Sequence, residues 1–268
     1  MNIKRYAYEH VSSEVLSEDM QFKDTAPKAG DPLPEFDLPT ADGGHLRTGD
    51  LIGQPVLLVT GSFTCPMTAS SNPILKELHA RFGSQIKFVT LYVREAHPGE
   101  HHDQASMAEE KRKAARALKS RDQLPWTFAV DDPEGSLHRR LDEKPNAAYL
   151  VDRNGRIVFR SLWAGDESGL AQALEAVAQG ELPPKEESTR RLVPMARGVG
   201  TMRETTRRAG PRAQSDLWQA APPIGIMALL ADLYRPLPPV WRTAAAAATL
   251  GVGLCVVATL AARAASRR

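Results

Sequence analysis

Cysteine is scarce in this chain, since only Cys65 and Cys255 occur among 268 residues, and they are far apart in the sequence. Such usage excludes a disulfide framework and an all-cysteine metal site. No charge sign dominates either, because 34 basic residues face 32 acidic ones, so nucleic acid is not expected as a partner. A hydrophobic content of 42% excludes a wholly disordered chain.

The first 28 residues contain no apolar run, and nothing in them resembles a secretory signal. Changes in composition along the chain indicate where its segments begin and end. We predict an N-terminal extension over residues 1–24, a folded domain over 25–180, a linker over 181–216 and a tail over 217–268. The linker is rich in arginine, glycine and threonine and lacks a sustained apolar period.

The tail contains 20 uncharged residues at 243–262, which matches the roughly 20 residues that span a bilayer as a helix. We therefore predict a single-pass membrane anchor that leaves the folded domain cytoplasmic. A buried alanine-rich helix is the alternative. The stretch 217–233 contains Pro222 and Pro223 and is predicted to be interfacial, with a second span left open. Pairing of two chains through small residues of the tail helix also stays open.

Within 25–180, apolar runs of strand length and helical spacings alternate. After an extended lead-in, they predict an α/β fold with a mixed sheet flanked by helices, in the thioredoxin-like layer arrangement. The predicted strands are 55–61, 86–93, 126–130, 146–151 and 156–160. The predicted helices are 72–82, 106–121, 137–141 and 166–179.

Cys65 lies between the first strand and the first helix. A helix N-terminus favours the thiolate through free N–H groups and the helix dipole, so a lowered thiol pKa is expected. Ser62 and Thr64 supply hydroxyls that can donate to the thiolate or orient a substrate. The ordinary alternatives are a small buried cysteine and hydroxyls that only form a turn.

Glu95 and His97 leave the next strand, where ligands gather in open α/β sheets. His97 can pass a proton to a leaving group while Glu95 holds its tautomer. An ordinary salt bridge in a solvated loop is the alternative. The neighbouring cluster of acids and histidines is not expected to bind metal, because its members share one loop. This cluster comprises His97, Glu100, His101, His102 and Asp103.

Two motifs carry a family resemblance. Residues 61–66, Gly-Ser-Phe-Thr-Cys-Pro, and 92–98, Tyr-Val-Arg-Glu-Ala-His-Pro, resemble the iodothyronine deiodinases, where selenocysteine precedes the proline. The lead-in at 30–59 is similar to redoxins such as peroxiredoxins, which belong to the thioredoxin superfamily. The resemblance covers residues 30–165. Here cysteine replaces selenocysteine, and Thr68 replaces the second cysteine of a Cys-x-x-Cys pair, so no internal disulfide can form.

The resemblance implies a thiol-dependent oxidoreductase in which Cys65 attacks a peroxide, a disulfide or an activated halide. Thr64, Ser62, Glu95 and His97 are the other predicted catalytic residues. Pro66 and Pro145 are predicted to contact substrate, and Pro145 corresponds by position to the cis-proline of thioredoxin-like folds. We expect no cofactor and no metal, but an external thiol reductant such as a thioredoxin or glutathione. Reductive dehalogenation of aromatic halides and a non-catalytic binding domain at a membrane are the alternatives.

Overall fold

Strand β3 (Val56–Gly61) runs through the centre of the sheet in a computed structural model that describes residues 6–265. From residue 253 onward, Cys255 has the one side chain that is described. All six residues of β3 are buried, as expected of an apolar run enclosed on both faces. Leu57 and Val59 contact one hydrophobic cluster and Val56 and Leu58 the other, because successive strand residues point to opposite faces.

The sheet has six strands in the order β5-β4-β3-β6-β7-β8. β4 (Lys87–Tyr92) pairs in parallel with β3 and with β5 (Thr127–Val130). β6 (Ala148–Val151) is antiparallel to both β3 and β7 (Ile157–Ser161), and β8 (Glu187–Ser188) is parallel to β7. The carboxyl ends of β3, β4 and β5 therefore meet at one edge of the sheet.

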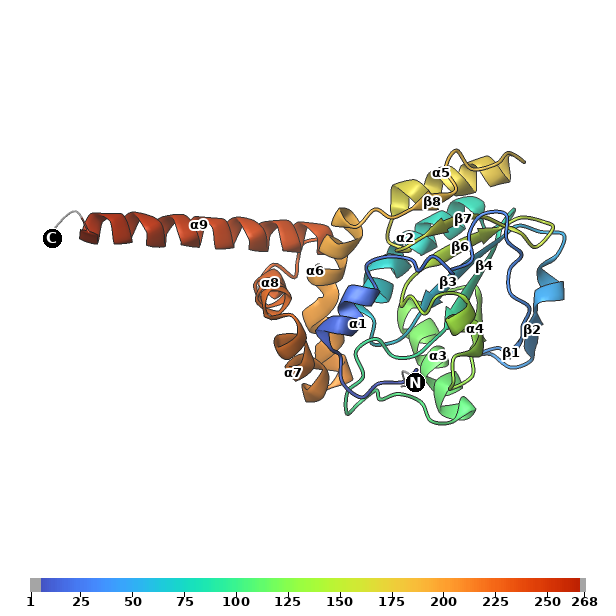
Figure 1. Ribbon diagram of the computed structural model, residues 1–268, viewed down its shortest axis with the longest axis horizontal. Helices are drawn as coiled ribbons and strands as arrows, with labels where there is room; N and C mark the ends of the chain where they lie inside the picture. The colour runs from blue at the N-terminus through green and yellow to red at the C-terminus, as the bar shows by residue number, and fades with distance from the viewer. Residues whose placement is uncertain (1–5, 266–268) are drawn as a thin grey trace.

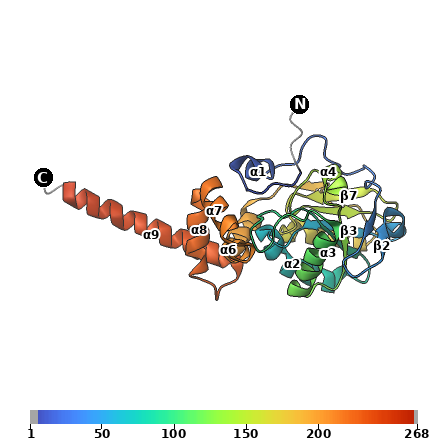
Figure 2. The same cartoon turned by 90° about the horizontal axis from the view of Figure 1, so that it is seen from below.

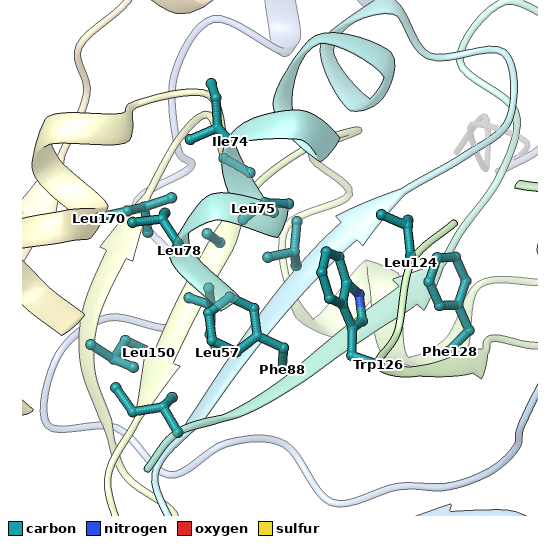
Figure 3. Packing of buried hydrophobic residues seen from close by; sticks show 14 of the residues in the cluster. Leu57, Ile74, Leu75, Leu78, Phe88, Leu124, Trp126, Phe128, Leu150 and Leu170 are labelled. Carbon is teal, nitrogen blue, oxygen red and sulfur yellow. The ribbon is translucent and has the colours of Figure 1, made fainter. Parts of the chain in front are cut away.

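Helices α2 (Pro66–Phe82), α3 (Ala108–Asp122) and α5 (Glu167–Ala178) bury side chains in the cluster around Leu57. Figure 3 shows residues of β3, α2 and the segment before β5 packed together there. The other cluster includes α4 (Ser136–Arg140) and the lead-in, whose elements precede β3. These are β1 (Asp37–Pro39), β2 (His45–Arg47) and the 3-10 turn η1 (Thr48–Leu51). Helix α1 (Ser13–Glu18) lies before the lead-in and has no buried residue.

The predicted mixed α/β fold is confirmed, and the predicted strands and helices between residues 55 and 179 are all present within a few residues, apart from the start of α2. Helix α2 begins six residues before the predicted position 72, with Pro66 in its first turn. The sequence misleads here because Pro73 suggests a helix start, whereas it lies inside α2.

The linker prediction is wrong in its second half, where α6 (Leu192–Ala209) forms and packs on α2. Small residues allow a close approach: a Cβ at Gly198 would lie 2.3 Å from Met67 Sδ on α2. One at Gly200 would lie 2.1 Å from the carbonyl oxygen of Pro239, so α6 also packs closely on the chain near residue 239. The apolar spacing rule misses such a helix because glycine and threonine, rather than large apolar residues, face its neighbours.

Three more helices follow, α7 (Pro211–Ala220), α8 (Pro222–Asp232) and α9 (Pro239–Ala265). Part of the stretch 217–233, which the sequence predicts to be interfacial, packs internally, since Leu217 and Ala228 form a small cluster with Met202. Other large apolar residues of this stretch are exposed: Trp218, Ile226, Leu229 and Leu233. In Figures 1 and 2, α6, α7 and α8 lie beside α1 at one end of the molecule, and α9 projects away from them.

The predicted membrane span over residues 243–262 is helical within α9, but the membrane assignment is not supported. None of the helices, over the residues that the structure describes, is both long and apolar enough to cross a bilayer. Alanine, with little apolar surface, fills positions 244–248 of this helix. The side chains of 253, 254 and 256–262 lie outside the described residues.

Replacing Leu57 with alanine should lower the free energy of unfolding by about 2–5 kcal/mol, because the side chain is fully buried and leaves a cavity. Urea denaturation of the full chain measures this. Leu182→Ala is the matched control, since Leu182 is 78% exposed and should change stability by less than about 0.5 kcal/mol. Equal effects of the two substitutions would contradict the assignment of Leu57 to the core.

Candidate active site around Cys65

Cys65 is the N-cap of α2, and its side chain is 1% exposed. Its Sγ accepts a hydrogen bond from the Thr68 backbone N–H at 3.4 Å. The helix N-terminus thus contacts the sulfur as the sequence predicts. The Thr68 hydroxyl and the backbone N–H groups of Thr68 and Met67 all favour the thiolate.

The thiol pKa nevertheless shifts the other way. Burial raises the pKa of Cys65 to about 11, against 9.0 for an ordinary thiol, and the nearby Asp19 charge adds to this. The expectation of a lowered pKa is therefore wrong for this arrangement, because loss of hydration outweighs the helix N-terminus. At neutral pH the enclosed sulfur carries its proton.

Glu95 joins the loops after β3 and β4. Its Oε2 accepts hydrogen bonds from the Thr64 backbone N–H at 2.8 Å and from the Thr64 hydroxyl at 2.6 Å. Tyr92 donates its hydroxyl to Oε1. Burial raises the pKa of this carboxyl, and these donors partly offset the rise. The predicted pairing of Glu95 with the His97 ring is absent, because both carboxylate oxygens face Thr64 and Tyr92.

Ser62 and Thr64 act on the backbone and not on the sulfur. The Ser62 hydroxyl accepts from the Ala96 N–H at 3.3 Å, and the Thr64 hydroxyl accepts from the His97 N–H at 3.1 Å. Both hydroxyls therefore fix the loop after β4 against the loop after β3. They position His97 rather than polarise the thiol directly.

His97 lies in the same cavity as Cys65 and is 4% exposed. Its Nδ1 is buried without a hydrogen-bond partner among the described residues. Burial lowers the pKa of His97 to about 4, so the ring is neutral at pH 7. A neutral imidazole can accept a proton or a hydrogen bond there, whereas the imidazolium expected of a strong proton donor is absent.

The cavity around Cys65 has a volume of about 80 Å³ and is lined mainly by apolar side chains. Pro66 and Pro145, both predicted to contact substrate, line it. The peptide bond before Pro145 is trans, as are all peptide bonds in the described part of the chain, so Pro145 differs in this respect from the cis-proline to which it corresponds by position. The Lys144 carbonyl before it accepts a hydrogen bond from the Thr60 hydroxyl at 2.7 Å, which ties this loop to β3.

Sequence reasoning missed several residues of the site. Thr68 is one of them, and its position three residues after Cys65, the spacing of an N-cap contact, is a signal that could have found it. Trp163 had no local signal, yet it lines the cavity and its Nε1 is buried without a partner among the described residues. The remaining walls come from α1, α6 and α8, which the sequence placed outside the folded domain. They are Val15, Leu16, Asp19, Met20, Met195, Gly198, Val199, Met202 and Ile224.

The histidine-rich loop after His97 contacts the C-terminal helices. The Glu100 carboxylate accepts from the Arg212 N–H at 3.0 Å, and the His101 N–H donates to the Ala209 carbonyl at 2.9 Å. His102 stacks on Phe63 with ring centroids 4.0 Å apart. Across the described residues, no group of three or more His, Cys, Asp or Glu side chains could hold a metal ion.

The sequence profile of the family described as Redoxin matches residues 28–174, more than half of the chain. The protein therefore belongs to the redoxin family, with a thioredoxin-like fold whose strand-to-helix turn carries Cys65. No curated protein matches it.

Solved structures are similar to this chain at low identity. An uncharacterised conserved protein from Geobacillus kaustophilus is 14% identical with a TM-score of 0.50, covering 63% of this chain and 90% of its own. A putative thiol:disulfide interchange protein DsbE from Chlorobium tepidum is 22% identical with a TM-score of 0.46, covering 57% of this chain and 99% of its own.

Alkylation of Cys65 by iodoacetamide should be slow at neutral pH and rise about tenfold per pH unit toward pH 11, because the raised pKa keeps the sulfur protonated. The rate is measured in a Cys255→Ser chain. Thr68→Val should slow it further by removing a hydroxyl that favours the thiolate, whereas Asp19→Asn should speed it. A plateau below pH 8 would show that burial does not control this thiol.

His97 should make the fold sensitive to acid. Its folded pKa of about 4 lies below the ordinary 6.5, so the unfolded chain binds the proton more tightly. The stabilisation is complete above pH 6.5 and is lost as the pH falls toward 4, by about 3 kcal/mol. In denaturant titrations, His97→Gln and His97→Asn should both reduce the change of the unfolding free energy with pH between pH 6.5 and 4. An unchanged slope in both variants would disprove the assignment.

Proposed function

We propose that the protein is a single-cysteine thiol peroxidase, in which Cys65 reduces a small hydroperoxide and an external thiol regenerates the enzyme. The observation that carries this proposal is the small cavity of about 80 Å³ around the sulfur of Cys65, which is 1% exposed. A protein disulfide cannot enter so small a space, whereas a small oxidant can. Helix α9, which carries Cys255, projects away from the sheet and α2 (Figure 1), so in this proposal the second thiol comes from another molecule.

In the proposed reaction the hydroperoxide is reduced and the cysteine is oxidised. Sγ attacks the outer oxygen of R–O–OH, the O–O bond breaks, and the leaving oxygen takes up a proton to give the alcohol ROH. The cysteine becomes a sulfenic acid. A first thiol then condenses with it, releasing water and forming a mixed disulfide, and a second thiol restores Cys65 and leaves as a disulfide.

Proton movement is the difficult part, because the thiol pKa of about 11 leaves only about one molecule in ten thousand as thiolate at pH 7. The neutral His97 ring in the same cavity supports a relay from the thiol to the leaving oxygen. The Thr68 N–H and hydroxyl favour the anion during attack. Thr64 and Glu95 act at a distance by holding the His97 backbone.

Reductive dehalogenation of an aromatic iodide is less favoured. An apolar cavity of about 150 Å³ binds benzene, and the cavity here is about half that size. An aromatic ring carrying iodine would require the surrounding helices to separate.

Purified full-length protein should consume an organic hydroperoxide in the presence of dithiothreitol or glutathione, and Cys65→Ser should abolish turnover. Cys255→Ser is the matched control and should retain it. A sulfenic acid at Cys65 should be trapped by dimedone after peroxide is added without thiol. Iodide release from iodoaromatics, with no peroxide consumption, would instead favour dehalogenation, and absence of both would leave a binding domain.

A further inference from the structure

The cavity around Cys65 is only partly built by the redoxin region. More than half of its lining residues lie outside residues 28–174, on α1, α6 and α8. We define the flanking wall as these nine residues, Val15, Leu16, Asp19, Met20, Met195, Gly198, Val199, Met202 and Ile224. Figure 2 shows α1, α6 and α8 gathered at the end of the molecule near the start of α2.

The flanking wall is fixed directly to the turn that carries the cysteine. The Thr201 hydroxyl of α6 donates to the Pro66 carbonyl at 2.9 Å, one residue from Cys65. Gly198 lies against Met67, with no room for a side chain between them. Helix α6 is therefore seated on the first turn of α2, where the sulfur is.

The two flanking segments also hold each other. Asp216 of α7 is 4% exposed and accepts from the Val11 N–H at 3.1 Å, and its other oxygen lies 2.9 Å from His10 Nδ1. On the other side, the Lys144 ammonium donates to the Glu18 carbonyl at 2.7 Å, tying the end of α1 to the loop that carries Pro145. The N-terminal and C-terminal segments that carry the flanking wall are therefore bonded to each other, and the N-terminal one is also bonded to the loop that carries Pro145.

The chemistry of the cavity indicates what it accommodates. Its surface is almost wholly apolar, and four methionines contribute adaptable side chains: Met20, Met67, Met195 and Met202. Against this background two buried ring nitrogens have no hydrogen-bond partner within the described part of the chain: Trp163 Nε1, which donates, and His97 Nδ1. A buried polar atom without a partner is costly, so a ligand that satisfies both would bind with a gain.

We propose that the flanking wall selects hydroperoxides with a short, slender apolar body, whose terminal oxygens contact Trp163 and His97. This inference rests on the proposed function and adds the substrate class and the residues that choose it. The hydroperoxide group contains both an acceptor oxygen and a donor hydroxyl, so it can satisfy both nitrogens while its apolar body contacts the methionines. Hydrogen peroxide lacks that body, and a bulky body exceeds about 80 Å³.

The test compares kcat/KM for hydrogen peroxide, an unbranched alkyl hydroperoxide and cumene hydroperoxide, using the full chain. Val199→Ala enlarges the cavity. It should raise the ratio of kcat/KM for cumene hydroperoxide to that for hydrogen peroxide about tenfold, the effect of one methylene or more in an apolar pocket. Val193→Ala, the same change on the same helix at a residue that is 49% exposed, is the matched control and should leave the ratio unchanged. Trp163→Phe should raise KM several-fold for the unbranched substrate.

A second measurement does not depend on turnover. Unreactive primary alcohols of increasing length should protect Cys65 from iodoacetamide, with a length limit that Val199→Ala extends and Val193→Ala does not. If the protein turns over peroxides but Val199→Ala changes neither the cumene-to-hydrogen-peroxide ratio nor the longest alcohol that protects Cys65, the role of the flanking wall is overturned and the peroxidase activity is not. Alcohol protection that shifts as expected, without turnover, would overturn the peroxidase and retain the wall. Neither turnover nor protection would overturn both.

Discussion

The Glu95 carboxylate is the contact on which the site depends, because it ties together loops that leave neighbouring parallel strands. Thr64 and Tyr92 surround its two oxygens, so the turn after β3 and the loop after β4 hold a single relative position. That position places Cys65 and His97 in one cavity. A buried carboxylate is tolerated there because donors compensate its lost hydration.

Burial controls the chemistry of this cavity more strongly than local geometry does. The same enclosure raises the Cys65 pKa and lowers the His97 pKa, since both shifts favour the uncharged form. The cavity therefore holds a thiol and a neutral imidazole, with little charge to attract water. The flanking helices that line this cavity therefore belong to the same enclosure that suppresses the thiolate.

Much of the fold was predictable because its signals are local. Apolar runs such as 55–61 read directly as buried strands, and alternating elements imply a mixed α/β sheet. The helix α6 was not predictable in this way, since Gly198 and Thr201 face α2 and carry no apolar period. The same holds for Trp163, which no neighbouring residue marks as part of the site.

The amino-acid sequence by itself determined the strand-turn-helix position of Cys65, the hydroxyls beside it, and the pair Glu95 and His97 after the next strand. Their grouping follows because parallel strands end at one edge of a sheet. Only the tertiary structure decided that Glu95 binds Thr64 rather than His97, and that the thiol pKa rises. The first result depends on how the loops after two neighbouring strands pack together. The second depends on burial of the sulfur, to which the distant segments α1 and α6 contribute and which no local pattern records.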